Sequence, residues 1–285
     1  MRLTTLYIIA FVASWSFVSS LYSSNNNSNI PQGGVYMTEI TQNEYEQDLF
    51  INNQQQLTWK DKNKFYLIYG VPYSSQIKQY TYKVQNKNKA TLKKITINVI
   101  KKDFKTQRIK VNKKYTSPSK DIMQKIKKDR IKLSKAREVW LDINPDLDFI
   151  LPVKGITTGV FGTKRFYNDV EGNYHNGFDI AADIGSPIVA PTSGKVILTG
   201  NFFYNGKSII LDHGRGLKSI MIHLDKILVK KNEYIDKGQI IGRVGTTGKS
   251  TGPHLHWSLL VNNTYIDPEL LLNRRIIKNL NLEGS

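Results

Sequence analysis

Histidine and aspartate residues toward the C-terminus have the types and spacing of a metal centre. One residue separates His254 from His256 in a stretch typical of a strand, so both imidazoles project to the same side of it. Upstream, His175 and Asp179 lie four residues apart with a glycine between them, and His223 lies between the two stretches. Neutral imidazole is the most common metal ligand among side chains. The grouping therefore predicts a metal site or an acid–base site.

The number of candidates indicates what kind of metal site these side chains form. A catalytic zinc site uses three protein ligands and keeps one further position for water, whereas a structural site uses four protein ligands. Three of the five residues should therefore hold one Zn²⁺ per chain, and the other two should carry protons. One assignment makes His175, Asp179 and His256 the ligands. A second assignment exchanges His254 for His256, and the spacing does not separate the two.

Composition and charge narrow the class of protein. The chain has 285 residues, enough for about two domains, and a net charge of +18 that favours anionic partners. Nucleic acid, anionic lipid and anionic cell-wall polymers all fit this charge, and a solvated lysine-rich surface is the simpler explanation for much of it. Because the chain has no cysteine, disulfides, iron–sulfur clusters and thiol nucleophiles are excluded.

Residues 1–20 have the pattern of a signal peptide. A positive start precedes an apolar run from Leu6 to Val18, which is too short to span a bilayer and ends in small residues. We expect export, with cleavage near Ser20 or retention of the segment as an N-terminal anchor. Residues 21–30 are polar and predict a flexible lead.

Hydrophobic patterns predict a sandwich and a helix before the histidine-containing region. Residues 31–113 contain short runs of alternating β-branched and aromatic residues, typical of a small antiparallel, immunoglobulin-like β-sandwich. Ser117 and Pro118 have the pattern of a helix start. Residues 117–141 then repeat apolar residues at helical spacing, which predicts an amphipathic linker helix. A helix on a membrane surface is the alternative for its basic face.

The C-terminal part, residues 150–273, is rich in glycine and in short strands. It predicts a mainly β catalytic domain in which the histidines and Asp179 lie on strands or at their ends. His213 precedes a glycine turn, so we expect it to make structural hydrogen bonds. Residues 274–285 form a short basic tail without a motif.

Several motifs in this region resemble those of the lysostaphin/LytM-type zinc metallopeptidases, which cut peptidoglycan cross-links. The matching segments are His175-x-x-x-Asp179, Gly245 to Trp257 with His254-x-His256, Phe161-Gly162, Arg165 to Asn168, Gly185 to Pro191, Asp212-His213-Gly214 and His223-Leu224. The resemblance covers about residues 150 to 270. The β-rich region before it, with Gly70-Val71-Pro72, more weakly resembles the N-terminal domain of some Gram-negative members.

The resemblance implies a β-sheet groove that holds one zinc ion. The implied ligands are His175, Asp179 and His256. The implied groups that stabilise the transition state are His223 and His254.

The resemblance also implies substrate contacts at the groove mouth, from Arg165 and Asn168. A structural salt bridge is the alternative for Arg165. The position two before His223 is often tyrosine in the family and is Met221 here. This departure concerns fine substrate preference and leaves the core mechanism intact.

The sequence therefore predicts an exported zinc metalloendopeptidase of the periplasm or cell envelope, which hydrolyses peptide bonds in peptidoglycan stems or cross-links for cell-wall remodelling. We expect a monomer with peptidoglycan and an envelope regulator as candidate partners, no nucleic acid and no stable membrane span after signal removal. The N-terminal domain is expected to shield the groove. The alternative is a catalytically silent protein of the same fold that binds the wall or activates another hydrolase; such relatives lack metal ligands, and here none is missing.

Two other interpretations fit the sequence less well. Gly248-Lys249-Ser250 looks like part of a phosphate-binding loop, but Arg243 stands where that loop needs glycine, and no helix pattern follows. Two histidines with one carboxylate also form the site of non-haem iron oxygenases. Those sites need no further histidines, whereas two extra proton carriers suit hydrolysis.

Overall fold

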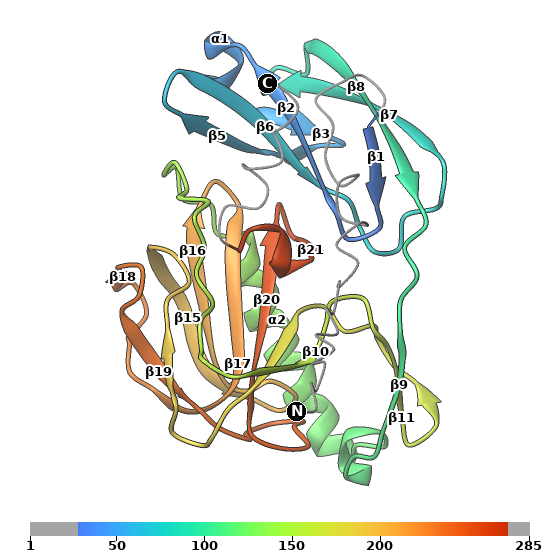
Figure 1. Cartoon of the computed structure of the whole chain (residues 1–285), viewed down its shortest axis with the longest axis vertical. Helices are drawn as coiled ribbons and strands as arrows, with labels where there is room; N and C mark the ends of the chain where they lie inside the picture. Colours follow the sequence, from blue (N-terminus) through green and yellow to red (C-terminus); the bar gives the residue numbers. More distant parts are fainter. Residues whose placement is uncertain (1–27, 273–285) are drawn as a thin grey trace, which may run out of the picture.

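A computed structural model describes residues 28–272, which form two units (Figure 1). An N-terminal β-sandwich and a C-terminal unit built on a ten-stranded sheet are joined by a segment that contains helix α2 (Lys120–Glu138). The mainly β fold predicted from the sequence is confirmed. The predicted signal peptide and tail lie outside the described residues. The last residues of the predicted flexible lead, from Ser28, belong to a strand.

The N-terminal unit consists of two sheets that share one core. The first sheet has the order β1 (Ser28–Pro31), β8 (Thr91–Ile100), β7 (Gln79–Asn86), β3 (Leu49–Ile51), β4 (Gln54–Gln55). The second has the order β2 (Val35–Ile40), β6 (Lys64–Gly70), β5 (Leu57–Asp61), and helix α1 (Gln42–Tyr45) follows β2. Alternate residues of both sheets, such as Tyr36, Leu67 and Ile97, fill the space between them.

One pairing in the sandwich departs from the predicted antiparallel arrangement. Strand β1 pairs with β8 in parallel. The chain leaves β1 for the second sheet, so no hairpin forces an antiparallel neighbour on it. The antiparallel prediction is therefore wrong at this edge and holds for the other pairings of the two sheets.

The second sheet of the sandwich is buried on both faces. Residues that alternate with the sandwich core, among them Met37, Trp59 and Ile68, lie in a hydrophobic cluster with Phe149 and Leu259 of the C-terminal unit. Strand β6 also contacts β20 (His254–Val261) and β21 (Thr264–Ile266). The two units thus share a core and pack as one body.

Shortening Trp59 should reveal how much this shared core contributes to stability. Trp59 is 5% exposed, and truncation of a buried tryptophan to alanine typically costs about 3–5 kcal/mol of unfolding free energy. We expect Trp59→Ala to lose about that much in urea unfolding, whereas Leu92→Ala, at a side chain that is 36% exposed, should change stability by about 0.5 kcal/mol or less. Equal losses in the two variants would contradict the shared core.

The C-terminal unit is an antiparallel sheet that supplies most of the site (Figure 1). Its main path has the order β10 (Ile156–Gly159), β13 (Phe178–Ala181), β20, β17 (Leu217–Ile227), β16 (Gly206–Gly214), β15 (Gly194–Phe202), β18 (Tyr234–Ile235). Strand β19 (Ile240–Val244) pairs with β17 and with β14 (Pro187–Val189), and β21 pairs with β20. A short helix, η2 (Pro268–Leu270), follows β21.

A strand from the linker joins the C-terminal unit. Strand β9 (Thr106–Ile109) leaves the sandwich region and pairs in parallel with β11 (Lys164–Tyr167), which also pairs with β12 (Val170–Glu171). This three-stranded sheet lies beside the main sheet (Figure 1). The linker therefore builds part of the surface around the site.

Helix α2 begins two residues later than its sequence pattern predicts. Ser119, not Ser117, is the N-cap, because Ser119 is extended and its side chain accepts a hydrogen bond from the Ile122 amide. The helix ends at Glu138, and a short helix η1 (Lys113–Tyr115) precedes it. Buried Ile126 and Ala136 face the C-terminal unit. Within the described range, no helix combines the length and apolarity that a membrane span requires.

Candidate metal centre and active site

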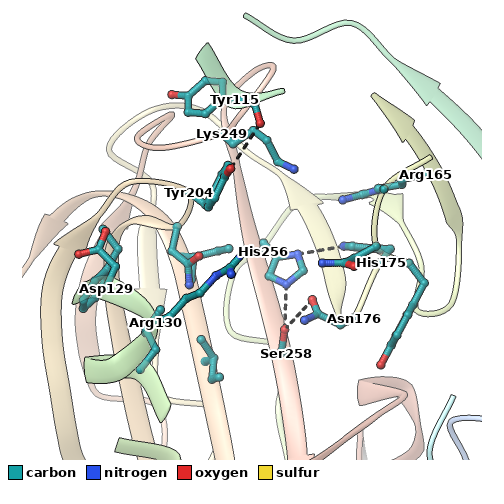
Figure 2. Close-up of a pocket in the computed structure, with 18 of the residues that line it drawn as sticks. Tyr115, Asp129, Arg130, Arg165, His175, Asn176, Tyr204, Lys249, His256 and Ser258 are labelled. Carbon is teal, nitrogen blue, oxygen red and sulfur yellow. Dashed lines mark hydrogen bonds between the residues drawn. The ribbon is translucent and has the colours of Figure 1, made fainter. Parts of the chain in front are cut away.

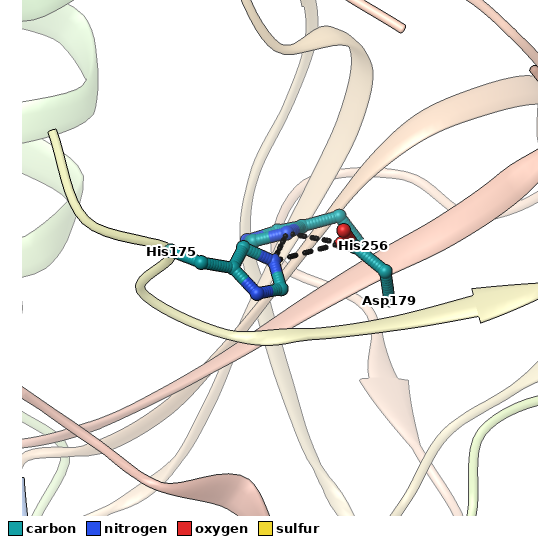
Figure 3. Close-up of side chains that lie close together, drawn as sticks. All are labelled: His175, Asp179 and His256. Atoms are coloured by element: carbon teal, nitrogen blue, oxygen red, sulfur yellow. Dashed lines mark hydrogen bonds and ion pairs between the residues drawn. The ribbon is translucent and has the colours of Figure 1, made fainter. Parts of the chain in front are cut away.

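Three side chains converge at one point on the main sheet (Figure 3). Asp179 on β13 and His256 on β20 stand directly opposite each other in the antiparallel register, and His175 lies in the loop before β13. His175 Nε2 lies 2.9 Å from both Asp179 Oδ1 and His256 Nδ1, and Asp179 Oδ1 lies 2.8 Å from His256 Nδ1. All three residues are buried. The structure therefore brings together the three residues that the resemblance implies as ligands.

Backbone hydrogen bonds to residues 162 and 163 fix the loop that carries His175. The amide of Gly162 donates to the His175 carbonyl (2.7 Å), and the His175 amide donates to the Thr163 carbonyl (2.8 Å). Gly177 leaves space for the cluster, since a Cβ at this position would lie 2.8 Å from His256 Nε2 and 2.5 Å from a backbone oxygen. A side chain at position 177 would displace His256 or the strand that carries it.

The chemistry of these donors fits a cation. His175 Nδ1 lies 2.8 Å from the Val160 carbonyl oxygen, which can only accept, so Nδ1 carries the proton and Nε2 of the neutral ring presents a lone pair. That lone pair, a carboxylate oxygen and His256 Nδ1 meet within hydrogen-bond distance. A single proton on His256 Nδ1 would satisfy only part of this set, whereas a metal ion bound by all three satisfies it completely. Two imidazole nitrogens and one carboxylate oxygen form a common catalytic ligand set for Zn²⁺.

Contacts within the cluster keep Asp179 ionised, and burial keeps His256 neutral. Burial alone would raise the pKa of Asp179, but its contacts with His175 and His256 outweigh burial and hold this pKa below the usual range. Arg165 donates from Nη2 to Asp179 Oδ2 (2.5 Å). Burial lowers the pKa of His256 to about 4 despite the opposing contact with Asp179. Asp179 and His256 are therefore in the protonation states that a metal requires.

A bulge in β17 aims His223 at the cluster. The register of β17 against β16 shifts just before Leu224, so that β17 carries one extra residue there. His223 accordingly has φ 69°, in the left-handed region. Its ring centroid lies 4.9 Å from that of His254 and 6.3 Å from that of His256. Burial is the main reason that the pKa of His223 is lowered to about 3.

His254 lies beside the cluster and outside its shortest contacts. Its Nε2 is 3.9 Å from Asp179 Oδ1, whereas His256 Nδ1 is 2.8 Å from the same oxygen. His254 Nδ1 is engaged by the Gly252 carbonyl at 2.8 Å. Of the two assignments that the spacing left open, this geometry favours His256 in the cluster and His254 next to it.

The fifth histidine makes the structural hydrogen bonds expected of it. His213 Nδ1 bonds the Ser193 carbonyl (2.9 Å) and Nε2 bonds the Ser219 hydroxyl (2.7 Å). Burial lowers the pKa of His213 to about 4 from the ordinary 6.5, although the bond to Ser193 opposes the shift. The ring is therefore neutral in the folded protein at neutral pH.

This shift predicts a loss of stability in acid. Because the folded pKa of His213 is lowered, the unfolded chain binds the proton first, and stability falls as pH drops from about 6.5 toward about 4. Between pH 7.5 and pH 5 the loss from this residue should be about 2 kcal/mol. Urea unfolding in the presence of a chelator should show a steeper decline for the parent than for His213→Gln. Parallel stability–pH curves for the two proteins would contradict this assignment.

A groove of about 1020 Å³ opens above the cluster (Figure 2). Figure 2 shows Arg165 on one side of the groove, Asp129 and Arg130 of the linker on the opposite side, and Tyr204 and Lys249 above. The groove lining also includes Tyr115, Arg137, Tyr167 and Tyr174. The site is therefore a cleft between the main sheet and helix α2, open enough for an extended peptide.

The linker is tied to the groove by specific contacts. Tyr115 donates its hydroxyl proton to the Gly248 carbonyl (2.5 Å), and the buried Asp129 accepts from the Phe203 amide (2.7 Å). No residue of 28–100 lines the groove. The expected shielding of the groove by the N-terminal domain therefore has no counterpart in the groove lining, and the second sheet of the sandwich packs on the C-terminal unit instead.

The structure separates the two residues implied in substrate binding. Arg165 lines the groove, with Nη2 on Asp179 and Nε on Gln107 (3.3 Å). Asn168 lies in the turn after β11, where its amide donates to and accepts from the backbone of Val111 (2.9 Å each). Asn168 is absent from the described groove lining.

Other groove residues were missed by the sequence reasoning. Ser258 bonds His256 Nε2 (2.8 Å) and shares its face of β20, which the two-residue spacing could have indicated. Lys249 also lines the groove, although in the sequence it belongs only to an incomplete phosphate-loop pattern. Met221 is fully buried in the core, on the opposite face from the groove-lining Ile222. That position therefore offers no groove contact here.

Comparisons with known proteins agree with this geometry. Residues 173–268 match the pattern of Peptidase family M23. The chain is 44% identical over 114 residues to the peptidoglycan DD-endopeptidase ShyB of Vibrio cholerae, a match covering 39% of this chain and 26% of ShyB. Lysostaphin of Staphylococcus simulans is 38% identical over 105 residues, covering 36% of this chain and 21% of lysostaphin. The chain thus matches about a quarter or less of the length of these relatives.

The similarity to a solved structure extends over both units. A crystal structure from Pseudomonas aeruginosa described as an M23 peptidase superimposes with a TM-score of 0.69 and 26% identity, covering 85% of this chain and 95% of that one. The sandwich, linker and C-terminal unit therefore recur together in one arrangement. Residues 173–268 therefore match Peptidase family M23, and His175, Asp179 and His256 converge within this same region.

Proposed function

We propose that the chain is an exported zinc metalloendopeptidase that hydrolyses peptide bonds in peptidoglycan stems or cross-links. The observation that carries the proposal is the meeting of three metal-binding atoms at the floor of a peptide-sized groove. Two further histidines, His223 and His254, adjoin the same point. A catalytically silent regulator of the same fold would not need a complete set of these groups.

The residues of the chain have distinct roles in this proposal. Zn²⁺, held by His175, Asp179 and His256, would polarise a carbonyl and lower the pKa of water. Arg165 holds Asp179 from the side away from the histidines, since it binds Oδ2 while they face Oδ1. Such partners orient a ligand and raise metal affinity.

The two remaining histidines are prepared to move protons at the same atom. His254 Nδ1 faces the Gly252 carbonyl and His223 Nδ1 faces the Thr247 carbonyl, both at 2.8 Å. A carbonyl only accepts, so each Nδ1 carries the proton and each Nε2 presents a lone pair to the groove side. His254 takes the proton of the attacking water at Nε2. His223 receives this proton at Nε2 from the neighbouring His254 ring and donates it to the departing amine.

The charge of the chain suits an anionic envelope. A net charge of +18 would hold the protein on a negatively charged wall, an effect that salt weakens. Peptidoglycan is the proposed substrate and partner, in the periplasm or envelope, with the protein acting as a monomer under the control of an envelope regulator. The name of the ShyB relative, a peptidoglycan DD-endopeptidase, supports this substrate class.

Digestion of purified sacculi tests the proposal. The protein is incubated with sacculi, and the released muropeptides are identified by mass spectrometry. We expect fragments separated at a peptide bond, in amounts that decline as salt is raised. One bound zinc per chain without any cleavage would instead favour the catalytically silent regulator, because the metal site would then be complete but would not hydrolyse peptidoglycan.

A further inference from the structure

Lys249 is a cation fixed inside the groove. It lies in the loop between β19 and β20, half-buried, and its side chain extends between Tyr204 and Arg165 (Figure 2). Its backbone amide donates to the Tyr204 carbonyl (2.8 Å). Its Nζ lies 3.5 Å from the ring centroid of Tyr167 and 5.5 Å from that of Tyr204. The ammonium group is thus held between two aromatic rings instead of extending into solvent.

Lys249 has no carboxylate partner among residues 28–272, where no Asp or Glu oxygen lies within 4.0 Å of its Nζ. The charge that acts on Lys249 is another cation, Arg165, which binds Asp179 through Nη2 and Gln107 through Nε. Burial, and secondarily Arg165, lower the pKa of Lys249 to about 8, so it remains mostly protonated at neutral pH. A partly buried, unpaired charge is costly unless a ligand pairs with it.

The surroundings of Lys249 select the chemistry of that ligand. An ammonium group bonds strongly to an anionic oxygen, and aromatic walls exclude the water that would compete. The groove beneath it leads to the cluster of His175, Asp179 and His256, where a peptide bond would lie. The anionic oxygens of a peptide are those of its carboxylates. One carboxylate lies close to the scissile bond when the residue that contributes the amine to this bond has a free carboxylate of its own.

We propose that Lys249 is a specificity-determining residue that binds a free carboxylate of the peptide adjacent to the scissile bond. The groove would then prefer a cross-link whose amine-donating residue carries a carboxylate over one in which that group is a carboxamide. This inference rests on the proposed peptidase function. It adds that the groove recognises a free carboxylate on the substrate.

Two synthetic cross-linked peptides test this role, identical except for a carboxylate or a carboxamide on the amine-donating residue. The measurement is the ratio of kcat/KM for the two peptides. The parent should favour the carboxylate by about tenfold or more, as expected for one charge-assisted hydrogen bond. Lys249→Met should bring the ratio close to one, and Lys249→Arg should keep most of the preference. The control is Lys231→Met, which removes a lysine that is exposed and outside the groove and should leave the ratio unchanged.

The outcomes separate this inference from the proposed function. Cleavage of both peptides by the parent at equal rates, or an unchanged ratio in Lys249→Met, would overturn the role of Lys249 and leave the peptidase standing. An equal loss on both peptides would assign Lys249 a purely structural place between the tyrosines. Cleavage of neither peptide by zinc-loaded parent would overturn the proposed function, and this inference with it.

Discussion

Replacing His256 with alanine should abolish both metal binding and hydrolysis. His256 Nδ1 is one of three atoms that meet within 2.9 Å, and its other nitrogen is held by Ser258. Without it, two ligands remain, one fewer than the three that a catalytic zinc site uses. Zinc should fall from about one per chain to a trace after dialysis, and hydrolysis of cross-linked peptide should fall to background.

A matched control distinguishes loss of the ligand from general disruption. His213 is equally buried, at 3% exposed against 6% for His256, yet it bonds only Ser193 and Ser219. His213→Gln should retain zinc and activity while losing stability. If His256→Ala kept stoichiometric zinc and the parental rate, the proposed ligand set would be incorrect.

Removing either neighbouring histidine should slow the reaction while zinc stays bound. His223 and His254 each present Nε2 beside the cluster and fix Nδ1 on a carbonyl. A positioned general acid or base typically contributes about 100- to 10,000-fold, so His223→Ala and His254→Ala should each lower kcat by a factor in that range. The double variant should lose less than the product of the two factors, because the groups act on one reaction centre.

Zinc content decides between the two ligand assignments in the same variants. Retention of about one zinc by His254→Ala would agree with its 3.9 Å distance from Asp179 Oδ1. Loss of zinc from His254→Ala would instead make His254 the ligand. A change in kcat of less than about threefold in both single variants would remove these histidines from the mechanism.

The sequence carried enough information for the strands and for the identity of the site. Alternation in β6, β7 and β8 predicted the sandwich, since a strand that packs on a core must repeat every two residues. It did not reveal that Met37, Trp59 and Ile68 would pack on a second unit, because burial on both faces depends on what lies opposite. The parallel edge at β1 and the N-cap at Ser119 likewise depend on where the chain goes next.

The candidate site was predictable where chemistry and spacing coincide. His254 and His256 share a face because strand geometry dictates it, and β20 shows this directly. The position of His223 follows from a bulge at φ 69°, which spacing does not encode. Two residues show where prediction from the sequence fails. Asn168 resembled a groove residue but binds Val111. Lys249 resembled part of a phosphate motif but lines the groove.

Zinc titration of the metal-free protein tests the central claim most directly, namely that His175, Asp179 and His256 hold the ion with which this chain cleaves peptides. Bound zinc and the release of new amino groups from a cross-linked peptide are measured in the same samples. We expect the rate to rise in proportion to bound zinc and to stop rising at about one zinc per chain. Full hydrolysis in the metal-free protein, or one tightly bound zinc with no hydrolysis, would contradict it.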